Sequence, residues 1–236
     1  MTSTLAAVTR SEVTAALDTV RDPELDEPVT SLGFVASCEL SPDGVVEVHL
    51  RLPTYFCAPN FAFLMVADAH DAVSAVPGVV RTVIVLDDHF ASDAINAGVA
   101  ARSGFADTFG EQADGELDSL RRDFVRKAVL AGTDRVCRPL IRTGATHEQL
   151  AGLCLGDVAA SHELDLLRAR RAELGLASDD ASPLLIDVET GTAVGESELR
   201  LHLGRARLSR VNIEANGSIC RGMLASRYGV PDHEED

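Results

Sequence analysis

The chain has 236 residues and a formal net charge of −16, with 46% hydrophobic residues, 4% aromatic residues and no tryptophan. An acidic surface repels phosphate backbones and anionic lipids, so neither nucleic acid nor membrane is an expected partner; the charge favours solubility or a basic partner protein. Residues 1–20 lack the unbroken apolar stretch of a signal peptide, and no run is long enough to span a membrane. A cytoplasmic protein with reduced thiols is expected.

The first elements predicted are a helix and a β-hairpin. Residues 11–20 place apolar side chains at helical spacing, with Ser11 as the expected cap, and a proline then ends the helix. Residues 33–40 and 45–52 predict two strands. They are joined by Asp43-Gly44, a pair typical of hairpin turns.

A loop, a second helix and a third strand follow. Residues 53–60 carry two prolines and a cysteine and predict a loop, residues 60–75 predict a largely apolar helix, and residues 79–86 predict a strand. The two helices are expected to pack on the same face of the small three-stranded sheet, which leaves its other face uncovered. A connector over 91–113 is expected to contain a short helix near 91–101.

The second half predicts mainly helices. Residues 114–132 show helical spacing, with Gly132 at the expected end. Two more helices are expected, over 146–158 with a capping box from Thr146 and over 161–174 with a cap at Ser161. The arginines expected on the outer side of the second are Arg168, Arg170 and Arg171. The remaining predictions are a strand over 184–188, a helix over 196–206, a strand over 208–214 and a helix over 216–228.

The predicted fold class is therefore α+β. A small three-stranded sheet with two helices, in the order α-β-β-α-β, is followed by a mainly helical C-terminal domain with a few short strands. The predicted division is an N-terminal domain over 1–90, a connector over 91–113, a helical domain over 114–230 and an acidic tail over 231–236.

Five cysteines are spread widely along the chain, and no C-x-x-C pair occurs, so a zinc ribbon or finger is not expected. They are Cys38, Cys57, Cys137, Cys154 and Cys220. Most are expected to be small buried hydrophobic residues. For Cys220, a core position is favoured over a role as a second thiol of a site.

Cys57 is the thiol best placed for chemistry. It stands just before a predicted helix, whose positive N-terminal end favours the thiolate that binds iron, zinc or a cluster edge. The carboxylates of Asp22 and Glu24 follow the first helix and could share that pocket. The competing interpretation is a buried cysteine beside a solvated turn.

Four sequence blocks within residues 10–88 carry a resemblance to a known family. They are Asp22-Pro23-Glu24, the run from Pro28 to Val35, Cys57, and Val76-Pro77-Gly78-Val79. In content and order they resemble the iron–sulfur cluster assembly domain of SufT, of PaaD and of the cytosolic iron–sulfur targeting factor. The sequence departs from that family at two places: Ala58 follows the cysteine where the family has proline, and Pro53 stands where the family has threonine, with Thr54 next to it.

The resemblance implies a maturation factor, not an enzyme. Iron or an iron–sulfur cluster would be held transiently by Cys57, with Asp22 and Glu24 in support. His89, which follows the third predicted strand between acidic residues, is a further metal-ligand candidate, and a surface histidine is the alternative. Asp93 and Asn96, about one helical turn further along, are weaker candidates that could add oxygen and nitrogen ligands. One thiolate and one histidine are too few for a stable cluster, so bridging by a homodimer or transfer to a client metalloenzyme is implied.

The client follows only by analogy. PaaD-like relatives serve multicomponent oxygenases, so a diiron monooxygenase subunit is a candidate client. The alternative function is a metal-free chaperone or docking protein for an oxygenase subunit. The spacing around 143–175 superficially resembles a helix-turn-helix, but the acidic charge makes a solvated helix face the better interpretation. No sequence motif of a hydrolase or a nucleotide-binding enzyme occurs.

Overall fold

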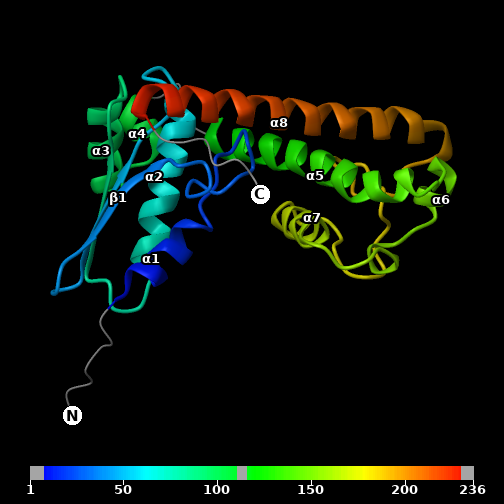
Figure 1. The fold of residues 1–236 in the computed structure, drawn as a ribbon, viewed down its shortest axis with the longest axis horizontal. Helices are drawn as coiled ribbons and strands as arrows, with labels where there is room; N and C mark the ends of the chain where they lie inside the picture. The colour runs from blue at the N-terminus through cyan, green and yellow to red at the C-terminus, as the bar shows by residue number, and fades with distance from the viewer. Residues whose placement is uncertain (1–7, 111–115, 230–236) are drawn as a thin grey trace, which may run out of the picture. The chain divides into compact units, whose positions relative to one another are not determined.

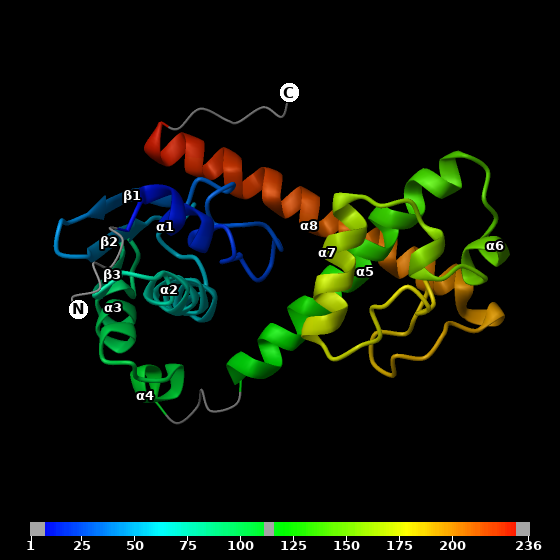
Figure 2. The same cartoon turned by 90° about the horizontal axis from the view of Figure 1, so that it is seen from below.

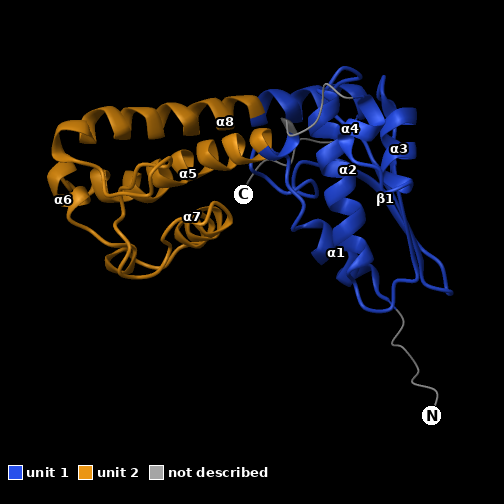
Figure 3. Ribbon diagram, turned by 180° about the vertical axis from the view of Figure 1, so that it is seen from behind, with its two compact units in different colours: residues 1–118, 217–236 blue, residues 119–216 orange. Residues whose placement is uncertain are grey.

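A computed structural model describes residues 8–110 and 116–229, which divide into two compact units (Figure 3). Unit 1 comprises residues 1–118 and 217–236, and unit 2 comprises residues 119–216. The predicted acidic tail and the end of the predicted connector lie outside the described residues. The predicted domain boundary near residue 114, with a C-terminal domain that folds independently, remains a prediction.

Helices and strands are mixed in the first part of the chain, up to β3, and the elements after β3 are all helices (Figure 1). In chain order they are α1 (Arg10–Leu17), β1 (Val35–Leu40), β2 (Val45–Leu50), α2 (Pro59–Ser74), β3 (Arg81–Leu86), α3 (Ser92–Ala100), α4 (Phe105–Phe109), α5 (Glu116–Arg142), α6 (His147–Ala151), the 3₁₀ helix η2 (Leu155–Asp157), α7 (His162–Glu173), the 3₁₀ helix η3 (Glu196–Glu198) and α8 (Leu199–Tyr228). No helix of the described parts combines the length and apolar character needed to cross a membrane.

Unit 1 contains a mixed three-stranded sheet in the order β1-β2-β3. β1 and β2 are antiparallel, while β2 and β3 are parallel, as expected when a helix connects them. The hairpin turn contains Gly44, whose positive φ of 83° suits glycine. On β2, Val46, Val48 and Leu50 are buried, whereas Glu47 on the other face is exposed. The predicted α+β class and the order α-β-β-α-β are confirmed.

The core of unit 1 lies between the buried side of the sheet and its helices (Figure 2). α1 contributes Val13 and Leu17, and α3 contributes Ile95. α2 buries most of its length, because its sequence is apolar on nearly every side. The far end of α8 adds Leu224 to the same core, so a segment remote in sequence completes unit 1.

The start of α1 differs from the prediction. The cap is Thr9 rather than Ser11, and Thr9 forms a capping box with Glu12. The side-chain oxygen of Thr9 accepts from the Glu12 amide, and the Glu12 carboxylate accepts from the Thr9 amide. A threonine with a glutamate three positions later therefore predicts the start of a helix better than an isolated serine does.

Unit 2 contains longer helices than the sequence predicts. Gly132 does not end a helix, because α5 continues to Arg142. Gly132 packs against Leu167 of α7, where a Cβ would lie in ordinary van der Waals contact at 3.4 Å, so this glycine lies inside a helix–helix contact and not at a helix end. Residues 208–214, predicted as a strand, and the predicted turn near Asn216 are both inside α8.

The short strands expected in the second half are absent from the described residues of unit 2. Two isolated β-bridges pair residues there instead: Cys154 with Pro183, and Ile186 with Ala193. The predicted caps at Thr146 and Ser161 are confirmed. The predicted helix over 146–158 is two shorter pieces, α6 and η2.

The prediction for Arg171 is wrong. Its side chain is 0% exposed, and its guanidinium donates to the carbonyls of Pro183 at 2.8 Å and Leu184 at 2.5 Å. Local helical spacing identified a charged side, but the segment after α7 folds back over it.

Candidate functional site

The loop that contains Cys57, residues 51–58, will be called the cysteine loop. Cys57 is half-buried and immediately precedes Ala58, the N-cap residue of α2, which offers no side-chain cap. The hydroxyl of Thr54 lies 3.4 Å from the Cys57 sulfur and accepts from the Phe56 amide at 3.2 Å. Either the Thr54 hydroxyl or the Cys57 thiol can be the donor in this contact. Thr54 reaches the sulfur although Pro53 occupies the expected threonine position.

His89, three residues after the end of β3, contacts the cysteine loop. Its side chain is 3% exposed, and its Nδ1 accepts from the Ala91 amide at 3.2 Å. Nε2 therefore carries the hydrogen and donates to the Cys57 carbonyl at 2.8 Å. Both ring nitrogens are engaged, so the geometry gives His89 a positioning role. Its predicted role as a metal ligand remains a prediction that requires one of these bonds to break.

Replacement of His89 by alanine is expected to destabilise unit 1 by about 1–3 kcal/mol, because the part-buried Cys57 carbonyl and Ala91 amide lose their partners and the buried ring leaves a space. The cysteine loop should loosen, so Cys57 should react faster with a maleimide. Urea unfolding and the rate of thiol labelling measure the two effects. His49→Ala is the matched control, since His49 pairs with Asp87 on the more open face of the sheet. Equal labelling rates in wild type and His89→Ala would contradict the positioning role.

Residues 22–27, the acidic turn, follow α1 and hold the other two predicted ligands. Asp22 is buried, and its Oδ1 accepts from the amides of Glu24 at 2.8 Å and Leu25 at 2.9 Å. Burial raises the pKa of Asp22 to about 6, although these two hydrogen bonds oppose the shift. Asp22 thus organises the turn, while Glu24 is half-exposed. Metal binding by either residue remains a prediction.

Cys220, in the last turns of α8, lies near the predicted ligands. It is half-buried, and burial raises the pKa of its thiol to about 11. The carboxylates of Asp22 and Glu24 raise the pKa of the Cys220 thiol further. The sequence favoured a core position for Cys220. Sequence spacing offered no sign of this neighbourhood, because α8 is needed to return the chain to unit 1.

Three exposed aromatic rings flank the cysteine loop, and the sequence prediction missed them. Tyr55 and Phe56 belong to the loop, and Phe90 follows His89; Phe56 is 78% exposed. The ring centroids of Tyr55 and Phe56 are 5.0 Å apart, and those of Phe56 and Phe90 are 6.0 Å apart. The sequence signal that could have predicted this cluster is the presence of aromatic residues directly beside Cys57 and His89. We refer to them as the aromatic cluster.

Two other candidate sites hold no evidence of a ligand. Asn96 is occupied structurally, since its side chain pairs with both backbone groups of Leu86, and Asp93 lies in the first turn of α3. Within residues 8–110 and 116–229, no three histidine, cysteine, aspartate or glutamate side chains are arranged to hold a metal ion.

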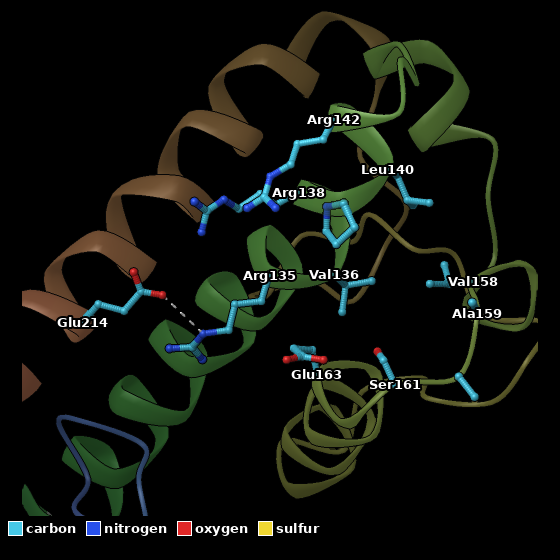
Figure 4. A pocket seen from close by; sticks show the side chains of 12 residues that line it. Arg135, Val136, Arg138, Leu140, Arg142, Val158, Ala159, Ser161, Glu163 and Glu214 are labelled. Atoms are coloured by element: carbon cyan, nitrogen blue, oxygen red, sulfur yellow. Dashed lines mark ion pairs between the residues drawn. The ribbon is translucent and has the colours of Figure 1, made fainter. Parts of the chain in front are cut away.

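A pocket of unit 2 is lined by arginines of α5 and by carboxylates, as Figure 4 shows. Arg135 points toward Glu214, with 3.8 Å between the paired atoms, and Glu163 of α7 lies on the opposite wall. The acidic side chains partly neutralise the arginines. The pocket therefore shows no preference for an anionic ligand.

Comparisons with known proteins concern the N-terminal part only. Residues 10–85 match the family model described as iron–sulfur cluster assembly protein. An iron–sulfur cluster carrier protein of Mycobacterium leprae is 34% identical over 82 residues, which are 35% of this chain and 21% of that protein. An uncharacterized protein of Methanocaldococcus jannaschii is 28% identical over 89 residues, which are 38% of this chain and 92% of that protein. No solved structure gives a significant match.

Proposed function

Because residues 10–85 belong to the iron–sulfur cluster assembly protein family, we propose that the chain is a maturation factor that carries iron or an iron–sulfur cluster on Cys57. The observation that supports this most directly is the environment of Cys57. Cys57 is half-buried just before the start of α2, its sulfur lies 3.4 Å from the Thr54 hydroxyl, and its backbone carbonyl accepts from His89. These contacts fix the position of the thiol at a helix N-terminus, where a metal-binding cysteine can be placed.

Transient binding distinguishes a carrier from a storage protein. The cargo must be held by few ligands, so that the client can supply the rest. Cys57 would provide the thiolate, and Asp22, Glu24 and His89 are the further ligands or positioning groups that we propose. None of these assignments requires catalysis by the chain itself, and we propose that it is not an enzyme.

The client is a further proposal. A subunit of a multicomponent diiron monooxygenase, in the cytoplasm, is our candidate, on the resemblance to PaaD-like proteins. The aromatic cluster lies beside Cys57 and offers exposed apolar surface of the kind that protein interfaces use. A homodimer that joins two Cys57 thiolates is another way to complete a cluster.

Cys57→Ser is expected to remove most of the bound iron. Wild type and variant would be purified anaerobically, and iron and acid-labile sulfide would be measured after reconstitution. Serine offers no thiolate, so the variant should retain little of either. Cys154→Ser is the matched control, because Cys154 is also half-buried but belongs to unit 2. A wild type that takes up no iron would refute the carrier function.

The second candidate function is a metal-free chaperone or docking protein for an oxygenase subunit, and the exposed aromatic cluster favours it. The two functions predict different behaviour of Cys57→Ser toward a client. A carrier variant would bind the client without activating it, whereas a metal-free chaperone variant would do both. Phe56→Ser, which leaves the thiol intact, should weaken client binding under either function.

A further inference from the structure

Two backbone carbonyls lack a backbone donor where the chain leaves β2 and β3. At the ends of these strands, the Asp87 amide still donates to the Leu50 carbonyl at 2.8 Å. Just beyond that bond, no backbone amide of the described residues donates to the carbonyl of Leu52 or of Asp88. A carbonyl only accepts, so these two groups cannot pair with each other and need a donor from elsewhere in the fold.

Arg227, in the last turn of α8, is the donor for both carbonyls. Its Nη1 donates to the Leu52 carbonyl at 3.1 Å, and its Nη2 donates to the Asp88 carbonyl at 2.7 Å. The planar guanidinium holds its N–H groups in a fixed arrangement, so one side chain can bridge two acceptors. Arg227 thereby ties the start of the cysteine loop to the residue that precedes His89.

The guanidinium of Arg227 is itself held in place. Its Nη2 lies 2.5 Å from Oδ2 of Asp88, and the Tyr228 hydroxyl lies 3.4 Å from the same oxygen. Leu224, one turn earlier on the same side of α8, is buried in the core of unit 1, to which these last turns belong (Figure 3). The end of α8 therefore cannot move away from the cysteine loop without exposing Leu224.

The backbone of Asp88 is in a conformation that suits glycine better than aspartate. Its φ is 48°, in the left-handed region, which costs free energy for a residue with a Cβ although aspartate tolerates it better than most. Strain of this kind persists where the surroundings enforce it, and it points to a role for the side chain. The contact that glycine could not make is the ion pair with Arg227.

Two further hydrogen bonds continue the connection toward the sulfur. The Phe90 amide donates to the Tyr55 carbonyl at 3.1 Å, and the His89 ring donates to the Cys57 carbonyl at 2.8 Å. Both donors follow Asp88 directly in the chain. The place of Asp88 therefore determines where both donors meet the cysteine loop.

We propose that Arg227 is a positioning residue for Cys57 and that Asp88 holds Arg227 in place. The proposal rests on the carrier function for its purpose, because a thiol that receives and releases a metal must be presented to the client in one place. Arg227 fixes the start of the cysteine loop, and through Asp88 it fixes His89, which holds the end of the loop. Arg227 and Asp88 lie outside residues 10–85, so the family match does not assign them.

The rate at which iodoacetamide labels each cysteine of the full, metal-free chain tests this role, with the labelled positions resolved by peptide mapping. Arg227→Ala should raise the rate at Cys57 by about tenfold, because two hydrogen bonds from a charged donor are lost and the loop opens more often. The rate at Cys38 should stay within about twofold of wild type. Cys38 is 7% exposed in the core of the same unit, so its labelling reports opening of the whole unit.

Two further variants identify the contact responsible. Arg221→Ala removes another ion pair of α8, with Glu27 at 2.7 Å, and should leave the rate at Cys57 within about twofold of wild type. Asp88→Gly keeps the carbonyl and suits the positive φ but removes the carboxylate, so Cys57 should label faster than in wild type and more slowly than in Arg227→Ala. Added to Arg227→Ala, Asp88→Gly should change the rate little, because the two residues act through one contact.

The outcomes separate positioning from general support of the fold. An equal rise at Cys57 and Cys38 in Arg227→Ala would show that the side chain only stabilises unit 1, and would overturn the proposal. An unchanged rate at Cys57, or a further large rise when Asp88→Gly is added, would overturn it too. Circular dichroism would check that each variant is folded. If Arg227→Ala does not fold, Asp88→Gly alone decides, since its rate at Cys57 must still exceed that of wild type.

Iron uptake, measured separately, keeps the carrier function distinct from the positioning role. A wild type that takes up no iron but shows the expected labelling pattern in the variants refutes the carrier function alone. A wild type that takes up iron, with unchanged labelling of Cys57 in Arg227→Ala, refutes the positioning role alone.

Discussion

Replacement of Arg171 by alanine is expected to destabilise unit 2 by about 3–5 kcal/mol. The guanidinium fills a fully buried space and donates to the carbonyls of Pro183 and Leu184, and alanine leaves both carbonyls without these donors. Burial lowers the pKa of Arg171 to about 10, so the side chain remains charged at neutral pH. Relief from burying that charge offsets part of the loss. Urea unfolding, followed by hydrogen exchange of amides in unit 2, measures the change.

Arg168→Ala is the control for this experiment. Arg168 lies one turn before Arg171 along α7, pairs with the largely exposed Asp180 at 2.6 Å and donates to the Ser178 carbonyl at 2.7 Å. The exposed ion pair contributes about 0–1 kcal/mol and the hydrogen bond about 1 kcal/mol, so the loss should be smaller than at Arg171. A loss at Arg171 no larger than that at Arg168 would show that the buried guanidinium does not hold the segment after α7.

The parts of the fold that could be predicted depend on short-range patterns. The alternation of β2, the Asp43-Gly44 turn and the caps at Thr146 and Ser161 are each determined by a few neighbouring residues. The place of Cys57 before α2 belongs to the same class, since a proline at the helix start marks it. These signals were enough for the order α-β-β-α-β in unit 1 and for the position of Cys57 just before α2.

The missed features depend on contacts between distant segments. Gly132 looks like a helix end until Leu167 is packed against it, and Arg171 looks exposed until residues 183–184 cover it. Asn216 and Gly217 suggest a turn, yet both lie inside α8, where Gly217 packs against the side chain of Glu27. The neighbourhood of Cys220 has the same origin. Local propensity is overridden wherever tertiary packing gives a larger free energy.

Asp22→Asn is expected to stabilise metal-free unit 1 by about 1–3 kcal/mol at pH 7.5. Burial raises the pKa of Asp22 from 3.8 to about 6, so between these values the folded state binds more protons than the unfolded state. Wild-type stability therefore falls as pH rises through this window, and the cost is complete above it. Asparagine keeps an oxygen for the amides of Glu24 and Leu25 without the charge. Urea unfolding at pH 7.5 and 4.5 should show the gain shrinking at the lower pH.

Asp43→Asn provides the control with the opposite sign. Asp43 is on the hairpin turn, where a hydrogen bond from Ser41 lowers the pKa of its carboxyl, so its replacement should bring no gain at pH 7.5. If Asp22→Asn also brings no gain, burial of the Asp22 charge is not costly. If it stabilises the apo protein but lowers the uptake of iron, the carboxylate is retained at a cost in stability. The negative charge of Asp22 would then serve the bound cation and not the fold.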